Sequence, residues 1–152
     1  MVPDRIEQEI LIDAPLEAVW AIVTEPKHVA AWFSDSAEID LRPGGEATLT
    51  WEKYGSVRAL VEKVEPPTLF SFRWARPVGA EPGEGNSTLV EFSLSTEGEG
   101  TRLRVVESGF TELEWSEDEK AKYAGENEEG WEHELGELRE YASSQMRLSN
   151  RQ

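Results

Sequence analysis

Glu107 is the residue whose type and position best suit acid–base or ligand-orienting chemistry in this chain. Strand alternation places it on the same face as Leu103 and Val105, so it points inward if that face is buried. Burial would raise the pKa of such a carboxyl group unless a cation pairs with it, and Arg73 and Arg76 are candidate partners. An inward carboxylate could orient a polar group of a bound molecule. Because Glu107 also ends its predicted strand, a carboxylate at the rim and in water is the alternative.

Other residue types exclude or disfavour several further kinds of chemistry. The chain has no cysteine, which excludes disulfides, thiolate metal ligands and cysteine nucleophiles. Its two histidines, His28 and His133, have no second metal ligand at helical spacing, and the His-Glu-x-x-His zinc pattern is incomplete at His133. A Gly-x-Ser-x-Gly nucleophile motif is also absent from the sequence. We therefore expect no metal and no cofactor, assign no catalytic residue, and favour a binding protein over an enzyme.

The net charge limits the kinds of partner. The 31 acidic and 15 basic residues give a formal net charge of −16. Such a surface repels phosphate backbones and anionic lipid headgroups, so we expect neither nucleic acid nor a membrane as a partner. The N-terminal residues do not have the pattern of a signal peptide, and no apolar run approaches the roughly 20 residues of a membrane span. We expect a cytoplasmic protein.

Aromatic residues are abundant for so polar a chain, with six Trp, five Phe and three Tyr. Burying one large aromatic side chain is worth about 2–3 kcal/mol, so a filled core is one explanation. The other is that some of these rings line a mostly apolar cavity, which is the usual form of a small-molecule site. Together with Glu107, the candidate ligand-binding residues are Trp32, Phe33, Trp51, Phe72, Trp74, Phe92, Phe110, Trp131, Leu135 and Leu138.

Alternating apolar and polar residues predict seven short strands connected by turns, the pattern of an antiparallel sheet. Pro15 and Pro26 each suit the first turn of a helix, and apolar residues at helical spacing follow both of them. We therefore expect two short helices after the first strand. The expected strands are 5–12, 37–41, 46–51, 56–64, 68–74, 87–95 and 101–107.

A long helix is predicted near the C-terminus. Apolar residues repeat at the spacing of one helical face over 130–146, and Asn127 is the expected N-cap. The preceding segment, 111–129, is rich in acidic residues and is expected to be a solvated loop or a loosely helical linker. A mobile lid with an apolar underside is the alternative. Residues 1–146 are expected to form a single domain, and 147–152 a tail.

These elements predict an α+β fold in which a curved antiparallel sheet of about six to seven strands wraps around the long C-terminal helix. Short motifs follow one another along nearly the whole chain: Asp13-Ala14-Pro15, Trp32-Phe33, Pro43-Gly44-Gly45, Val64-Glu65-Pro66-Pro67, Gly100-Thr101-Arg102-Leu103, Glu107-Ser108-Gly109-Phe110 and Gly130-Trp131. Their identity and order resemble the helix-grip fold of the START-like (SRPBCC) superfamily. More narrowly, the chain is similar to the short bacterial form of the domain named after the activator of Hsp90 ATPase.

The resemblance implies a range of functions, because fold alone does not select one. Members of this family include co-chaperone domains, carriers of apolar ligands and enzymes of aromatic polyketide metabolism. We expect this chain to bind a small hydrophobic or aromatic molecule in a pocket between the sheet and the C-terminal helix. The alternatives are a polyketide-type cyclase or hydrolase acting in the same pocket, and a co-chaperone or protein-interaction module whose partner is a chaperone or a second copy of the chain.

Overall fold

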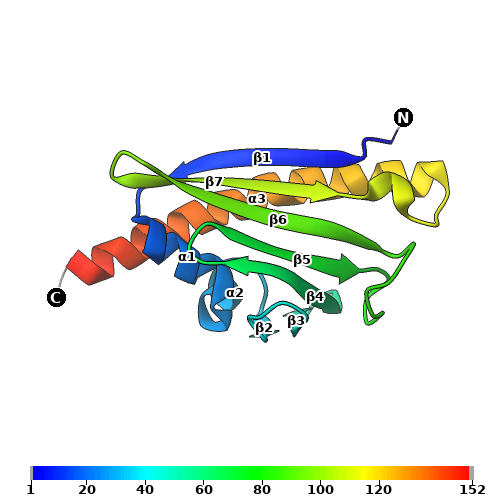
Figure 1. The fold of residues 1–152 in the computed structure, drawn as a ribbon, viewed down its shortest axis with the longest axis horizontal. Helices are drawn as coiled ribbons and strands as arrows, with labels where there is room; N and C mark the ends of the chain where they lie inside the picture. The colour runs from blue at the N-terminus through cyan, green and yellow to red at the C-terminus, as the bar shows by residue number, and fades with distance from the viewer. Residues whose placement is uncertain (1, 151–152) are drawn as a thin grey trace.

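In the computed structural model, which describes residues 2–150, a seven-stranded sheet faces one long helix (Figure 1). The strands are β1 (Arg5–Ile12), β2 (Ser36–Ile39), β3 (Glu46–Trp51), β4 (Gly55–Glu65), β5 (Leu69–Ala75), β6 (Ser87–Glu97) and β7 (Gly100–Ser108). The helices are α1 (Leu16–Thr24), α2 (Pro26–Trp32), the one-turn helix η1 (Phe110–Glu112) and α3 (Glu117–Asn150).

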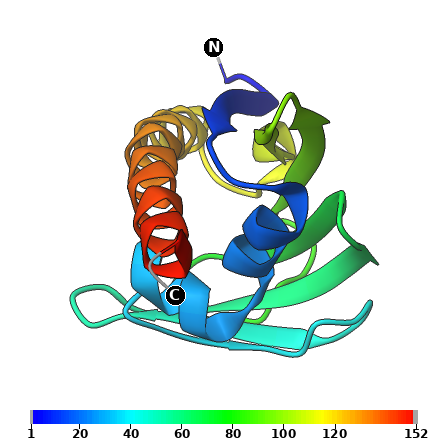
Figure 2. The same ribbon diagram turned by 90° about the vertical axis from the view of Figure 1, so that its left-hand side faces the viewer.

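The sheet is antiparallel throughout and has the strand order β1-β7-β6-β5-β4-β3-β2. It curves around the interior, with α3 on the other side of that interior (Figure 2). The helices α1 and α2 lie between the first strand and β2 in the chain, and both contact α3. This arrangement confirms the predicted α+β helix-grip fold, including the two short helices after the first strand.

The long helix begins at Glu117 rather than near Gly130, so its predicted start is wrong. Ser116 explains the earlier start: its Oγ accepts a hydrogen bond from the Glu119 backbone N–H at 3.2 Å and lies 3.0 Å from Glu119 Oε1. This Ser-x-x-Glu spacing is typical of a helix N-terminus. Asn127, the predicted N-cap, lies inside the helix. Residues 147–150 continue α3, and residues 151 and 152, the end of the predicted tail, lie outside the described residues.

Apolar side chains from the segment before α3 and from the first turns of α3 pack against the core. Phe110 and Leu113 are fully buried, and both belong to the main hydrophobic core. The Tyr123 ring lies 5.7 Å from the ring of Phe110 and 5.1 Å from that of Trp115, centroid to centroid. The first turns of α3 are therefore anchored to the core through aromatic contacts.

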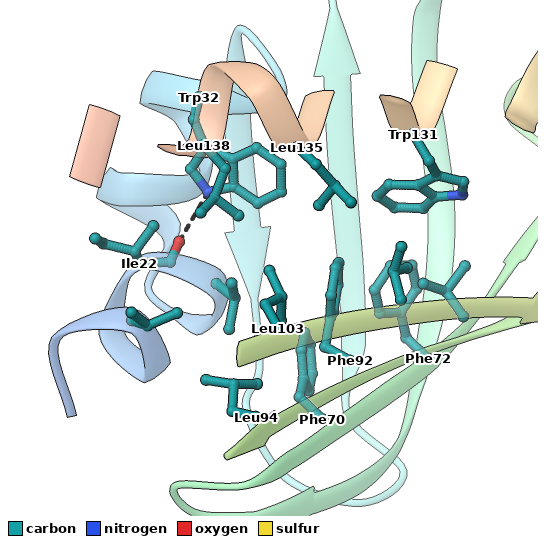
Figure 3. Close-up of a cluster of buried hydrophobic side chains, with 14 of the residues drawn as sticks. Ile22, Trp32, Phe70, Phe72, Phe92, Leu94, Leu103, Trp131, Leu135 and Leu138 are labelled. Atoms are coloured by element: carbon teal, nitrogen blue, oxygen red, sulfur yellow. Dashed lines mark hydrogen bonds between the residues drawn. The ribbon is translucent and has the colours of Figure 1, made fainter. Parts of the chain in front are cut away.

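The main core fills the space between the concave face of the sheet and the helices (Figure 3). Leu135 and Leu138 project from α3 toward the sheet, where Phe92 is one of the residues that face them. The buried Trp32 indole donates from Nε1 to the carbonyl oxygen of Ile22 at 2.9 Å, which satisfies its polar group. No helix within residues 2–150 combines the length and apolar character needed to cross a bilayer.

Candidate functional site

An open cavity of about 430 Å³ lies between the first half of α3 and the β3–β5 side of the sheet. Its walls come from four places: the end of α2, the β3–β4 hairpin, the end of β5 and one face of α3. The lining residues are Phe33, Trp51, Tyr54, Val57, Trp74, Arg76, Tyr123, Glu126, Asn127, Gly130, Trp131 and Glu134. The lining thus combines aromatic rings with a small number of polar and charged groups, as is usual for small-molecule sites.

Three rings form a nearly parallel wall of this cavity. The Phe33 ring is 5.4 Å from the Trp131 ring and 5.9 Å from the Trp74 ring, with interplanar angles of 9° and 17°. The Trp74 and Trp131 rings are 5.7 Å apart. Trp51 meets Phe33 edge to face, at 5.3 Å and 80°, and donates from Nε1 to the Phe33 carbonyl oxygen at 3.0 Å. Contacts between rings therefore hold the wall in one arrangement.

Glu107 is fully buried and does not line the cavity, but it accepts hydrogen bonds from three residues that do. Its Oε2 accepts hydrogen bonds from Trp74 Nε1 at 2.9 Å and from Thr88 Oγ1 at 2.6 Å. Its Oε1 accepts one from Trp131 Nε1 at 2.9 Å. Asn127 Nδ2 lies 3.0 Å from both carboxylate oxygens. A single carboxyl group therefore fixes two indoles and one amide of the cavity wall.

The environment of Glu107 has opposing effects on its pKa. Burial raises the pKa, and hydrogen bonds from Thr88, Trp74, Trp131 and Asn127 lower it by a smaller amount, so the pKa is above its ordinary value. All four partners can donate, which suits a carboxylate that accepts at both oxygens. The geometry thus assigns Glu107 a positioning role toward the cavity wall.

Two expectations about Glu107 are wrong. It does not lie at the rim in water, because its exposed fraction is 0%. Neither candidate arginine pairs with it: Arg73 donates to Glu62 Oε1 at 3.1 Å, and the Arg76 guanidinium lies 5.7 Å from the centroid of the Tyr123 ring. The hydrogen bonds to Glu107 in the described part of the chain come from uncharged donors instead.

Titratable side chains add polarity to the cavity lining. Burial, with a smaller contribution from the Glu107 charge, raises the pKa of the Tyr123 hydroxyl to about 12. Burial also raises the pKa of Glu134 to about 7; the neighbouring His133 lowers it, and Glu137 adds to the increase. A carboxyl group with a pKa near neutrality can exchange protons with a bound molecule or pair with a charge on it.

The eleven predicted site residues fall into separate groups. Four line the open cavity: Phe33, Trp51, Trp74 and Trp131. Phe33 also borders a separate apolar void of about 20 Å³, together with Trp32, Phe72 and Phe92, and such a volume has room for little more than one water molecule. The remaining apolar residues, Phe110, Leu135 and Leu138, are buried in the core and line neither space, and Glu107 lies in the shell around the open cavity.

Sequence reasoning predicted Trp131 but missed Tyr123, Glu126 and Asn127 as lining residues, because it placed them in the loop or linker before the predicted helix; Gly130 and Glu134 lay in the predicted helix but were not selected. Once the helix starts after Ser116, the lining positions 123, 126, 127, 130, 131 and 134 repeat at three- and four-residue intervals on one helical face. Tyr54 and Arg76 come from connections between strands, whose conformation the polarity pattern does not determine. The Ser-x-x-Glu spacing at 116–119 was the available signal.

The histidines and the acidic residues do not form a metal site within residues 2–150, where no group of three or more potential ligands converges. His28 Nδ1 lies 2.6 Å from the Tyr141 hydroxyl oxygen, which joins α2 to α3. His133 is exposed and lies 3.9 Å from Glu137 one helical turn later. His28 therefore takes part in a contact between α2 and α3, and His133 lies at the surface of α3.

The chain matches a protein-family model and is similar to several solved structures. A family model described as activator of Hsp90 ATPase homolog 1-like protein matches residues 13–143. Among solved structures, the protein MLL2253 from Mesorhizobium loti is 21% identical with a TM-score of 0.78, and the match covers 92% of this chain and 97% of that one. A search of the curated proteins found no match.

Two further solved structures are similar. DynU16, described as a protein in the dynemicin biosynthetic locus, is 26% identical with a TM-score of 0.74, and the match covers 93% of this chain and 48% of that one. The protein in the solution structure of the Aha1 dimer from Colwellia psychrerythraea is 20% identical with a TM-score of 0.73, and the match covers 89% of this chain and 92% of that one. At 20–21% identity, the Aha1 and MLL2253 similarities concern the fold.

Proposed function

Because the chain belongs to the activator of Hsp90 ATPase homolog 1-like family, we propose that it binds a small apolar or aromatic molecule in the open cavity beside α3. The observation that carries the proposal is the cavity of about 430 Å³ with Phe33, Trp51, Trp74 and Trp131 in its wall. A volume in this range fits a small organic molecule, and an apolar wall supplies affinity by removing ligand surface from water.

The buried network around Glu107 supports the same proposal. A cavity binds well when its walls keep their shape without the ligand, because no ordering has to accompany binding. The hydrogen bonds from Trp74, Trp131 and Asn127 to Glu107 hold these lining side chains in place. Without those bonds, the side chains could move into the cavity and fill it. We interpret Glu107 as a positioning residue and the rings as the contact surface.

Catalysis in the same cavity is the second candidate function. Glu134 lines the cavity with a pKa raised to about 7, and a general base works best when its pKa is near the working pH. DynU16, the 26% identical relative, is described as belonging to a biosynthetic locus. Turnover that is lost in Glu134→Gln while binding remains would support this candidate over simple binding.

A co-chaperone role would need an exposed apolar surface for a protein partner. The large apolar side chains that are exposed in the described part of the chain come from separate segments: Leu11, Leu41, Tyr54, Val78 and Leu148. The cavity therefore gives the stronger basis for a proposal.

Native mass spectrometry of the freshly purified protein tests the binding proposal. We expect an additional mass on the folded chain that is lost on denaturation, or saturable binding of small aromatic probes that changes the tryptophan fluorescence. The fluorescence change is expected because Trp51, Trp74 and Trp131 line the cavity. A bare chain that also binds none of the probes would contradict the proposal.

A further inference from the structure

The aromatic part of the cavity offers ring surface but no free indole donor. Trp74 and Trp131 donate their Nε1–H groups to Glu107, and Trp51 donates to the Phe33 carbonyl oxygen. A bound molecule therefore cannot use these three N–H groups as hydrogen-bond donors. What the rings can offer is apolar surface and the negative potential of the ring faces, which attracts cations within about 6 Å of a ring centroid.

The charged lining is predominantly acidic. Two carboxyl groups, Glu126 and Glu134, line the cavity, against the single guanidinium of Arg76 among the described lining residues. Neither carboxyl group forms an ion pair within residues 2–150. Burial raises the pKa of Glu134 more than the neighbouring His133 lowers it, and a cation bound nearby would favour its ionised form.

The charge of the whole chain acts in the same direction. A formal net charge of −16 attracts cations toward a cleft and repels anions from it. Arg76 opposes this effect locally, but its guanidinium lies against the Tyr123 ring at one wall of the cavity. The lining therefore presents aromatic rings and two carboxyl groups to a bound molecule, with one positive charge at the side.

We propose that the preferred ligand of this cavity is an organic cation, with an ammonium or similar group attached to an apolar or aromatic body. This inference rests on the proposed function, because it names the chemical class of the molecule that the same cavity binds. The apolar body would contact the wall of Phe33, Trp74 and Trp131, and the positive group would lie near Glu134.

Three probes of the same shape and different charge test the inference: phenyltrimethylammonium, tert-butylbenzene and benzenesulfonate. We expect the cation to bind about threefold to tenfold more tightly than the neutral probe, and the anion to bind most weakly. Dissociation constants are measured by titration of the tryptophan fluorescence at constant ionic strength, because salt screens the charged groups.

Two substitutions of lining residues should act in opposite directions. Glu134→Gln is expected to weaken phenyltrimethylammonium several-fold while leaving tert-butylbenzene nearly unchanged. Arg76→Met is expected to strengthen binding of the cation. Glu140→Gln, on an exposed position of the same helix, is the matched control and should change neither dissociation constant.

The outcomes separate this inference from the proposed function. Binding of tert-butylbenzene as tight as that of the cation, or tightest binding of benzenesulfonate, would overturn the preference for cations and leave a small-molecule cavity in place. The same conclusion would follow if Glu134→Gln left the ratio of cation to neutral affinity unchanged. Failure of all three probes, together with a bare chain in native mass spectrometry, would overturn both.

Discussion

Glu107→Ala is expected to lower the free energy of unfolding by about 4 kcal/mol or more, which is a large part of the stability of a small domain. Alanine leaves Thr88, Asn127 and Trp131 without the carboxylate acceptor they share, whereas Trp74 Nε1 keeps Thr88 Oγ1 as a second acceptor at 3.1 Å. Each buried donor left unpaired costs about 1–3 kcal/mol. Urea unfolding followed by circular dichroism measures the change.

Glu107→Gln keeps the shape of the side chain but removes one of its two acceptor oxygens. This variant should still fold, so it tests how much that acceptor contributes. Its amide nitrogen would replace one acceptor with a donor that faces other donors, so we expect a loss of about 1–3 kcal/mol. The matched control is Glu38→Gln, at an exposed strand position, which should stay within about 0.5 kcal/mol of the wild type. Equal stabilities of Glu107→Gln and the wild type at neutral pH would contradict the positioning role.

The pH dependence of the unfolding free energies of the wild type and Glu107→Gln gives a second test of this role. Burial raises the folded-state pKa of Glu107 above its ordinary value of 4.5, so the folded chain binds this proton more tightly than the unfolded chain does. Lowering the pH from neutrality toward 4.5 therefore adds stability to the wild type that Glu107→Gln does not gain. We expect the difference between the two unfolding free energies to grow as the pH falls, while the other carboxyl groups largely cancel in the comparison.

Gly130→Leu is expected to weaken ligand binding by about tenfold or more, equivalent to at least 1.4 kcal/mol. Gly130 lies on the cavity face of α3, and a Cβ added there meets no atom within 4 Å, so a larger side chain would extend into the cavity. Replacing a glycine inside a helix also removes a penalty of about 1 kcal/mol, so the fold should remain stable. Titration of phenyltrimethylammonium or tert-butylbenzene by tryptophan fluorescence gives the affinity.

Gly136→Leu is the matched control for this substitution. Gly136 lies on the same helix, is exposed, and also has no atom within 4 Å of an added Cβ, but it does not line the open cavity. Both variants should gain helix propensity, and only Gly130→Leu should lose affinity. Equal affinities of the two variants would show that the ligand lies elsewhere.

The order of elements was predictable because local patterns determine it. Alternation between apolar and polar residues in β1, for example, places Ile6 and Ile12 on the buried side of the first strand. The start of α3 was missed because acidic residues between 111 and 129 obscured a periodicity that continues through Tyr123 and Asn127. Charge on the outer face of a helix was thereby interpreted as evidence for a loop.

The site was less predictable than the fold, because it depends on contacts between distant segments. Strand alternation correctly turned Glu107 inward, but its partners come from β5, β6 and α3, which no local pattern brings together. Aromatic character alone could not separate Trp74, in the cavity wall, from Phe72, two residues earlier and beside the small void.

The most direct test of the central claim, that the open cavity beside α3 binds the ligand, uses the indole N–H signals in NMR spectra of the protein. The titration uses phenyltrimethylammonium or tert-butylbenzene, whichever binds more tightly. If the ligand binds in the open cavity, the largest shifts are expected at Trp51, Trp74 and Trp131, which line it, and small ones at Trp20 and Trp32, which do not. Largest shifts at Trp20 and Trp32, or none at saturation, would contradict the claim.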